Sequence, residues 1–147
     1  RAELNLSKHS ESYTNLLIWL TTCEEAMGNK DAGMQMRRKS VEHAERTYGP
    51  DNRVTFSTRY NYALVLVRAG RTEEALALID QIIGPAERAY PPNSPDRGYI
   101  YLGVGNILGR AEQYERALEY LDKARALFDR VFPDFDWVCE QVIHNYR

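Results

Sequence analysis

The sequence repeats itself with a period of 42 residues, and this repeat constrains the fold more than any other feature of the chain. Residues 54–95 align with residues 96–137 without a gap and share nine identical positions. Residues 12–53 align in the same register and form the most divergent copy. Self-similarity at this spacing is typical of an array of stacked units, each too small to bury a core alone. We therefore expect one domain over 1–147, with repeats at about 12–53, 54–95 and 96–137.

The apolar residues inside each repeat recur every three or four positions, which is the spacing of one face of an α-helix. Tyr60, Ala63, Leu64 and Val67 show this spacing clearly. Strand-like alternation is absent from the repeats, and short stretches rich in glycine, proline and asparagine separate the helical segments. We therefore expect an all-α chain with helices at about 11–27, 31–48, 52–69, 72–90, 94–111, 114–132 and 137–146.

Capping residues and one internal proline refine these boundaries. Asn52, Thr72 and Ser94 stand where a helix needs an N-cap. Pro85 follows Gly84 inside the fourth segment. A proline in a helix interior costs ~3 kcal/mol, because it lacks an amide hydrogen and its ring crowds the preceding turn. We expect Pro85 to interrupt this segment with a kink.

The two ends of the chain fall outside the three repeats. Residues 1–6 align one period before 43–48, so we expect 1–10 to hold the stub of a preceding helix and its loop, as in a fragment of a longer protein. After Trp137 the apolar residues again recur at helical spacing. We expect 137–147 to form a helix that caps the last repeat, because the end of a stacked array needs a cover.

Small residues occupy fixed positions within the repeats. In the third copy the pattern falls on Tyr101, Val104, Gly105 and Leu108, then on Ala117, Leu121 and Ala124. This pattern resembles the tetratricopeptide repeat, in which small residues such as Gly105 and Ala117 let two helices approach closely. The first copy departs from the pattern at Glu24 and Arg37. The period of 42, longer than the ~34 of most such repeats, resembles that of the kinesin-light-chain subclass.

The resemblance implies a right-handed α–α superhelix, or solenoid, of three helix pairs that acts as a non-catalytic scaffold for protein–protein interaction. In this family the first helix of each pair lines a concave groove, and its ligand-facing positions carry over to a set that we call the groove residues. They are Asn15, Ile18, Trp19, Thr22, Ser57, Tyr60, Asn61, Leu64, Arg68, Tyr99, Leu102, Asn106 and Arg110.

The groove residues suit a protein or peptide ligand. Trp19, Tyr60 and Tyr99 supply apolar area, asparagine side chains can pair with an extended backbone, and Arg68 with Arg110 attract acidic groups. Two alternatives stay open. One is a structural module that self-associates through its open amino-terminal end. The other is the regulatory arm of a larger signalling protein, such as a kinase, a transcriptional regulator or an ATPase.

Composition and motifs argue against other functions. The chain has 19 Lys and Arg against 21 Asp and Glu, and a net charge of −2 gives no general attraction to nucleic acid or membranes. His9, His43 and His144 lie in unrelated segments, so we expect no metal, no cofactor and no enzyme activity. The two distant cysteines indicate a reducing, cytoplasmic location, and we expect Cys23 to fill an apolar slot.

Overall fold

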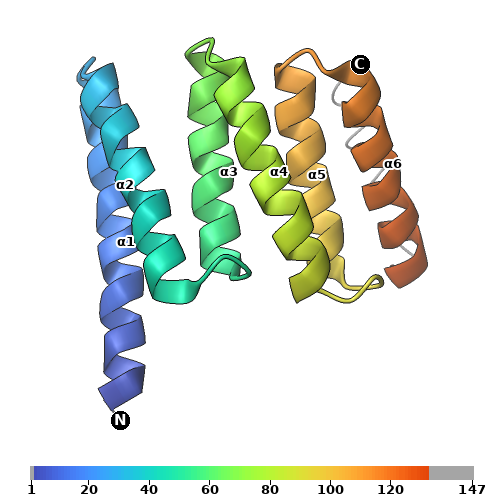
Figure 1. Cartoon of the computed structure of the whole chain (residues 1–147), viewed down its shortest axis with the longest axis horizontal. Helices are drawn as coiled ribbons and strands as arrows, with labels where there is room; N and C mark the ends of the chain where they lie inside the picture. The colour runs from blue at the N-terminus through green and yellow to red at the C-terminus, as the bar shows by residue number, and fades with distance from the viewer. Residues whose placement is uncertain (1, 133–147) are drawn as a thin grey trace. The chain divides into compact units, whose positions relative to one another are not determined.

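The computed structural model describes residues 2–132, which form α-helices joined by short turns and contain no strand (Figure 1). The helices are α1 (Ala2–Ala26), α2 (Lys30–Tyr48), α3 (Arg53–Arg68), α4 (Thr72–Ala89), α5 (Pro95–Arg110) and α6 (Tyr114–Val131). The all-α prediction is confirmed, and α2 to α6 begin and end within one residue of the predicted boundaries. The helix predicted at 137–147 lies outside the described residues.

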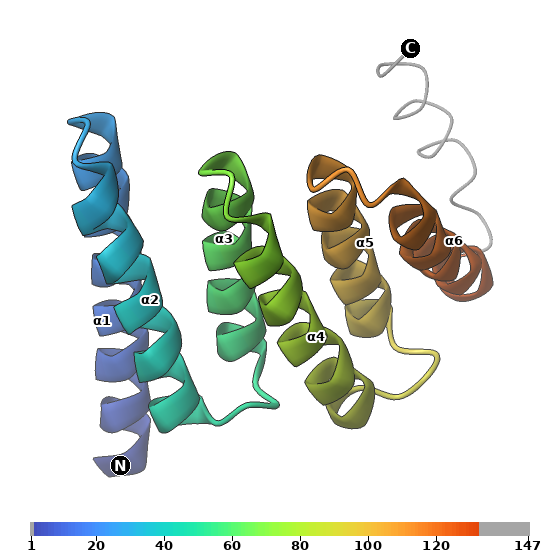
Figure 2. The same ribbon diagram turned by 45° about the horizontal axis from the view of Figure 1, so that its top comes forward.

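The chain divides into two compact units, Arg1–Pro85 and Ala86–Arg147. In the first unit α1 packs against α2, and α2 packs against α3. In the second unit α5 packs against α6, and each of these neighbouring pairs lies side by side in both ribbon views (Figures 1 and 2). Helix α4 contributes its residues up to Pro85 to the first unit and the rest to the second.

Helix α1 begins earlier than expected. It runs without a break from Ala2, so residues 2–10 continue this helix and do not form a separate stub and loop. The physical reason is visible in the sequence, because no glycine or proline occurs between Ala2 and Ala26 to end the helix. The alignment of this segment with the end of an earlier repeat therefore does not correspond to a helix boundary.

Helix α4 continues through Pro85 to Ala89. The helix predicted over 72–90 is therefore confirmed as one helix that contains the proline. Burial of Ile79 and Ile82, which are 0% and 2% exposed, stabilises the helix against the local cost of the missing hydrogen bond. The kink at this position stays a prediction.

The turn inside each repeat contains one residue with a positive φ angle. These residues are Gly28 (87°), Gly70 (77°) and Glu112 (60°). They follow one another at the 42-residue period of the sequence. Glycine adopts this conformation freely, whereas an L-residue with a Cβ atom pays about 1 kcal/mol or more. The third repeat therefore keeps the turn geometry although it has lost the glycine.

Two of the predicted N-caps are confirmed. Asn52 Oδ1 accepts a hydrogen bond from the Val54 amide at 2.9 Å, and Ser94 Oγ accepts one from the Asp96 amide at 3.2 Å. Thr72 is not a cap, because it is the first residue of α4. The two confirmed caps start α3 and α5, the helices that carry the second and third sets of groove residues.

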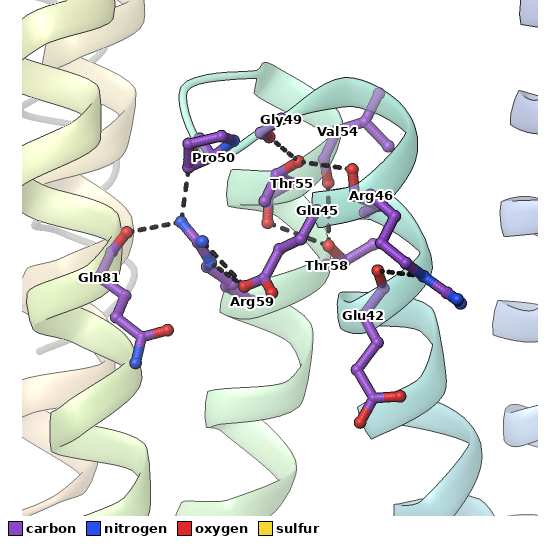
Figure 3. Close-up of polar contacts among 11 residues, drawn as sticks. Glu42, Glu45, Arg46, Gly49, Pro50, Val54, Thr55, Thr58, Arg59 and Gln81 are labelled. Carbon is purple, nitrogen blue, oxygen red and sulfur yellow. Dashed lines mark hydrogen bonds and ion pairs between the residues drawn. The ribbon is translucent and has the colours of Figure 1, made fainter.

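A polar contact recurs at equivalent positions of two repeats. Arg59, which is 5% exposed, donates from Nε and Nη2 to Glu45 Oε1 at 3.1 and 2.8 Å, and from Nη1 to the Gln81 carbonyl at 2.7 Å (Figure 3). One period later, Tyr101 donates its hydroxyl to Glu87 Oε1 at 2.9 Å. The same glutamate position thus joins a second helix to the following first helix in each unit.

The predicted close approach of two helices is confirmed in the second unit. A Cβ atom added to Gly105 of α5 would lie 2.6 Å from Leu121 Cγ and 3.3 Å from the Ala117 carbonyl oxygen of α6. Atoms do not approach to 2.6 Å without displacing one another, so a larger residue at this position would push the two helices apart. Gly105 and Ala117 therefore play the packing role that the sequence pattern assigns to them.

Candidate peptide-binding surface

The groove residues of the first unit lie on α1 and α3, and none of them is buried. On α1, Asn15, Trp19 and Thr22 are exposed and Ile18 is half-buried. Trp19 is 69% exposed, a large apolar area to leave in water. The α3 set follows the same pattern, with exposed Ser57 and Arg68 and half-buried Tyr60, Asn61 and Leu64. The structure therefore leaves this predicted set available to a ligand.

The groove faces of α1 and α3 meet at a small pocket that we call the junction pocket. It has room for about one water-sized group. Its lining residues come from three helices and are Ile18, Thr21, Arg37, Ser40, Thr58 and Asn61. Two of these, Ile18 and Asn61, are groove residues, so the pocket lies beside the predicted ligand path.

The hydroxyl groups of the junction pocket all donate hydrogen bonds to backbone carbonyls of their own helices. Thr21 Oγ1 donates to the Leu17 carbonyl at 2.6 Å, and Ser40 Oγ donates to the Met36 carbonyl at 3.0 Å. Thr58 Oγ1 lies 3.1 and 3.0 Å from the carbonyls of Val54 and Thr55. These three residues are 0–5% exposed, so the junction of α1, α2 and α3 has a buried polar layer. The hydroxyl oxygens keep their lone pairs as acceptors.

Arg37 enters the junction pocket as part of an ion pair. Its Nε and Nη2 donate to Glu25 Oε1 and Oε2 at 2.8 and 2.9 Å, a two-pronged contact between α2 and α1. The hydrogen bonds from Arg37 lower the pKa of Glu25 against the opposing effect of burial, and the charge of Arg68 lowers it further. Arg68 is a groove residue of α3, so its field reaches the end of α1.

Sequence reasoning missed most of this pocket. It identified Ile18 and Asn61 but not Thr21, Arg37, Ser40 or Thr58. The sequence does contain a signal for part of the pocket, because the first repeat departs from the apolar pattern at Arg37 and carries acidic residues at 24–25. An arginine at a helix-packing position requires an acidic partner when it is buried, and this requirement points to Glu24 or Glu25. The structure shows that Glu25 is the partner.

The groove residues of the second unit lie on α5. Tyr99 and Leu102 are 61% and 45% exposed, and Asn106 and Arg110 are exposed as well. The Tyr99 ring packs against the Phe128 ring of α6, with ring centroids 5.1 Å apart. Arg110 Nε donates to Asn106 Oδ1 at 3.1 Å, which holds the guanidinium along the helix. Along α5, the apolar residues Tyr99 and Leu102 therefore come before the polar residues Asn106 and Arg110.

A second exposed apolar strip runs along α1, and we call it the α1 strip. Its members recur at helical spacing and are Tyr13, Leu16, Leu20 and Cys23, with Met27 directly after the helix. At one edge of the strip the Tyr13 ring contacts His43 of α2, with ring centroids 4.8 Å apart. The expectation that Cys23 fills an apolar slot is wrong, because Cys23 is an exposed free thiol.

Residues 2–132 contain no group of three or more His, Cys, Asp or Glu side chains placed to hold a metal ion. None of the described helices is both long and apolar enough to cross a membrane.

Part of the chain matches a known repeat family. The tetratricopeptide repeat family model matches residues 13–84, so the predicted resemblance is confirmed over this range. Among curated proteins, the chain is similar to the clustered mitochondria protein homologs of Aspergillus oryzae, Aspergillus terreus and Aspergillus clavatus. Each is 26% identical over 103 residues, which cover 70% of this chain and 8% of the relative. The chain therefore spans only a small part of the length of these relatives.

Proposed function

We propose that this tetratricopeptide-type array is a non-catalytic module that binds a protein or peptide segment along the groove residues. The observation that carries the proposal is their exposure. Every groove residue on α1, α3 and α5 is exposed or half-buried, although these helices also supply the buried core residues Leu17, Phe56 and Leu108. A face that combines exposed aromatic rings, amides and arginines is typical of a binding surface.

The ligand chemistry follows from the same residues. Trp19 and Tyr60 offer apolar area, and the Asn61 amide can both donate to and accept from an extended backbone. The positive charge of Arg68 at the end of α3 favours acidic groups at that end of the segment. We therefore propose an extended peptide that carries an apolar residue followed or preceded by an acidic one.

The test starts with random linear peptides displayed on phage and selected against the full chain. We expect the selected peptides to lose about tenfold or more in affinity when Trp19→Ala and Tyr60→Ala are combined. A matched control combines Gln35→Ala with Lys39→Ala, two exposed positions of α2 outside the groove residues, and should leave binding unchanged. Equal losses from both pairs, or none from either, would falsify the groove assignment.

The α1 strip favours a second candidate function, in which the chain self-associates through this side of α1. Leu16 and Leu20 are 51% and 41% exposed, and apolar strips of this kind often mark an interface. Sedimentation at several concentrations separates the two candidates. A chain that stays monomeric throughout contradicts self-association, whereas a dimer abolished by Leu16→Glu supports it.

Three further proposals concern the context of this module. The positive-φ residues recur every 42 positions, which supports placing the repeats in the longer, kinesin-light-chain-like subclass. The large size of the relatives supports a module within a longer protein, where it would serve as a regulatory or docking arm. The free thiol of Cys23 supports a reducing location such as the cytoplasm.

A further inference from the structure

We infer that the junction pocket is a specificity subsite for a serine or threonine side chain of the bound peptide. This inference rests on the proposed function and adds a preference that the groove residues alone do not supply. It arises from the polar layer that Thr21, Ser40 and Thr58 form beneath Ile18 and Asn61.

The hydrogen-bonding groups around the pocket select for a hydroxyl group. The three buried hydroxyls donate their hydrogens to helix carbonyls. Thr21 is 0% exposed, so the oxygen acceptors that a ligand can reach are those of Ser40 and Thr58, which are 4% and 5% exposed. Asn61 supplies an amide that donates and accepts, and its side chain makes no hydrogen bond within residues 2–132. A ligand hydroxyl can donate to one of these acceptors and accept from the Asn61 amide at the same time.

The charges around the pocket select against an ionised group. The positive charge of Arg37 is matched by the two-pronged contact with Glu25, so the pocket carries no net charge to offset a buried carboxylate or ammonium. A carboxylate would also place its oxygens against the acceptor oxygens of Ser40 and Thr58. A lysine ammonium would meet the neighbouring guanidinium. A neutral group avoids both penalties.

The size of the pocket narrows the choice further. Room for about one water-sized group admits the hydroxyl of serine or threonine but not an aromatic ring or a glutamine side chain. A phosphate group is larger and charged, so we expect phosphorylation of the recognised residue to weaken binding at this subsite.

The experiment uses peptides selected from the random phage library on the full chain and confirmed to depend on Trp19 and Tyr60. We expect these peptides to share one serine or threonine whose replacement by alanine weakens binding to the wild-type chain about tenfold, as the loss of one or two hydrogen bonds predicts. The phosphorylated form of the same peptide should bind at least as weakly. On the Thr58→Val chain, which keeps the side-chain volume but loses the acceptor, the alanine replacement should change affinity less than about twofold.

Ser40→Ala provides a second variant in case Thr58→Val alters folding, and thermal denaturation of each variant checks that the fold persists. Thr47→Val is the matched control, because it makes the same chemical change at an exposed threonine of α2 that lies outside both the pocket and the groove residues. Groove-dependent peptides that show no serine or threonine preference, or whose preference survives both pocket variants, would overturn the subsite while leaving the groove proposal intact. Failure to obtain any peptide that depends on Trp19 and Tyr60 would overturn both.

Discussion

At the level of single residues, the turn inside each repeat depends on one position with a positive φ angle. Gly28 and Gly70 occupy it in the first two repeats and Glu112 in the third. A Cβ atom at Gly70 would meet no atom within 4 Å, so space is available and only backbone conformation selects glycine there. A substitution at this position therefore changes the free energy of unfolding through backbone conformation alone, without a contribution from packing.

This position gives a paired prediction. Gly70→Ala should lower the free energy of unfolding by about 1 kcal/mol, and Glu112→Gly should raise it by about 0.5–1 kcal/mol, because left-handed backbone is costly for residues with a Cβ atom. Urea denaturation of the two variants and the wild type measures both changes. A destabilising Glu112→Gly would show that the Glu112 side chain contributes more than its backbone costs.

Tyr101 gives a pH-dependent prediction. Burial, together with its hydrogen bond to Glu87, raises the pKa of Tyr101 to about 12 from its ordinary value of 10.0. Because the folded-state pKa is the higher one, the hydroxyl stabilises the fold fully below the unfolded pKa, and this contribution is lost as pH rises from 10 towards 12. Tyr101→Phe cannot ionise, so it should be less stable than the wild type at neutral pH, and the gap should close above pH 10. Urea denaturation of both chains across this range tests it, and a constant gap would contradict the burial of the hydroxyl.

At the level of helices, the packing of α5 on α6 depends on the absence of a side chain at Gly105. Four glycines lie in α5, and they differ sharply in their surroundings. Gly105 leaves no room beside Leu121, whereas a Cβ atom at Gly109 would meet nothing within 4 Å. The same chemical change therefore has opposite consequences at two positions of one helix.

We expect Gly105→Ala to lower the free energy of unfolding by about 1–2 kcal/mol, because overpacking outweighs the gain in helix propensity. Gly109→Ala should instead raise it, by at most about 1 kcal/mol. Thermal and urea denaturation of the two variants provide the comparison. If both substitutions changed the free energy of unfolding in the same direction, helix propensity, rather than the close approach of α5 and α6, would control the stability of this helix.

The helix pairs were predictable because the sequence signals that define them are local and occur in several repeats. Periodic apolar residues, the Asn52 and Ser94 caps and the small residue at Gly105 each report on a few neighbouring positions, and the repeat supplies them several times. The start of α1 was not predictable in this way. It depends on how far the helix extends through a segment that has no complete internal copy.

The candidate surface was predictable only as far as the repeat pattern reaches. The groove residues follow from their register and lie at accessible positions on α1, α3 and α5. The junction pocket arises instead where the first repeat departs from the pattern, with Arg37 and Ser40 in places that hold apolar residues in the second repeat, Ile79 and Ile82. A departure of this kind shows that the packing of the first repeat differs from that of the second. It does not show which side chains come into contact.

At the level of the whole chain, the helices that pack together within each unit are neighbours in chain order, as expected for an array. The end of such an array needs a cover. Tyr114 and Leu118 of α6 are 63% and 62% exposed within the described residues, which leaves apolar area for the segment that follows.

We predict that deleting 137–147 lowers the melting temperature by at least about 4 °C, because its apolar residues would cover the second helix of the third repeat. Calorimetry of the truncated and full chains measures this change. The full-length variant Val142→Ser with Ile143→Ser should reproduce most of the loss through the apolar face alone. An unchanged melting temperature in both would show that the segment adds nothing to the fold.

The polar layer at the junction of α1, α2 and α3 also has a mechanical consequence. Among the residues of the first helix pair whose burial is described, the large buried apolar side chains are Leu17 and Val41, and the pair also relies on the Glu25–Arg37 ion pair and on hydroxyl groups that water can solvate. The second repeat is held by Phe56, Leu66 and Ile79, which water solvates poorly when they separate. When tension is applied to the ends of the chain, we therefore expect extension to begin in the first pair, at a force that falls as ionic strength rises.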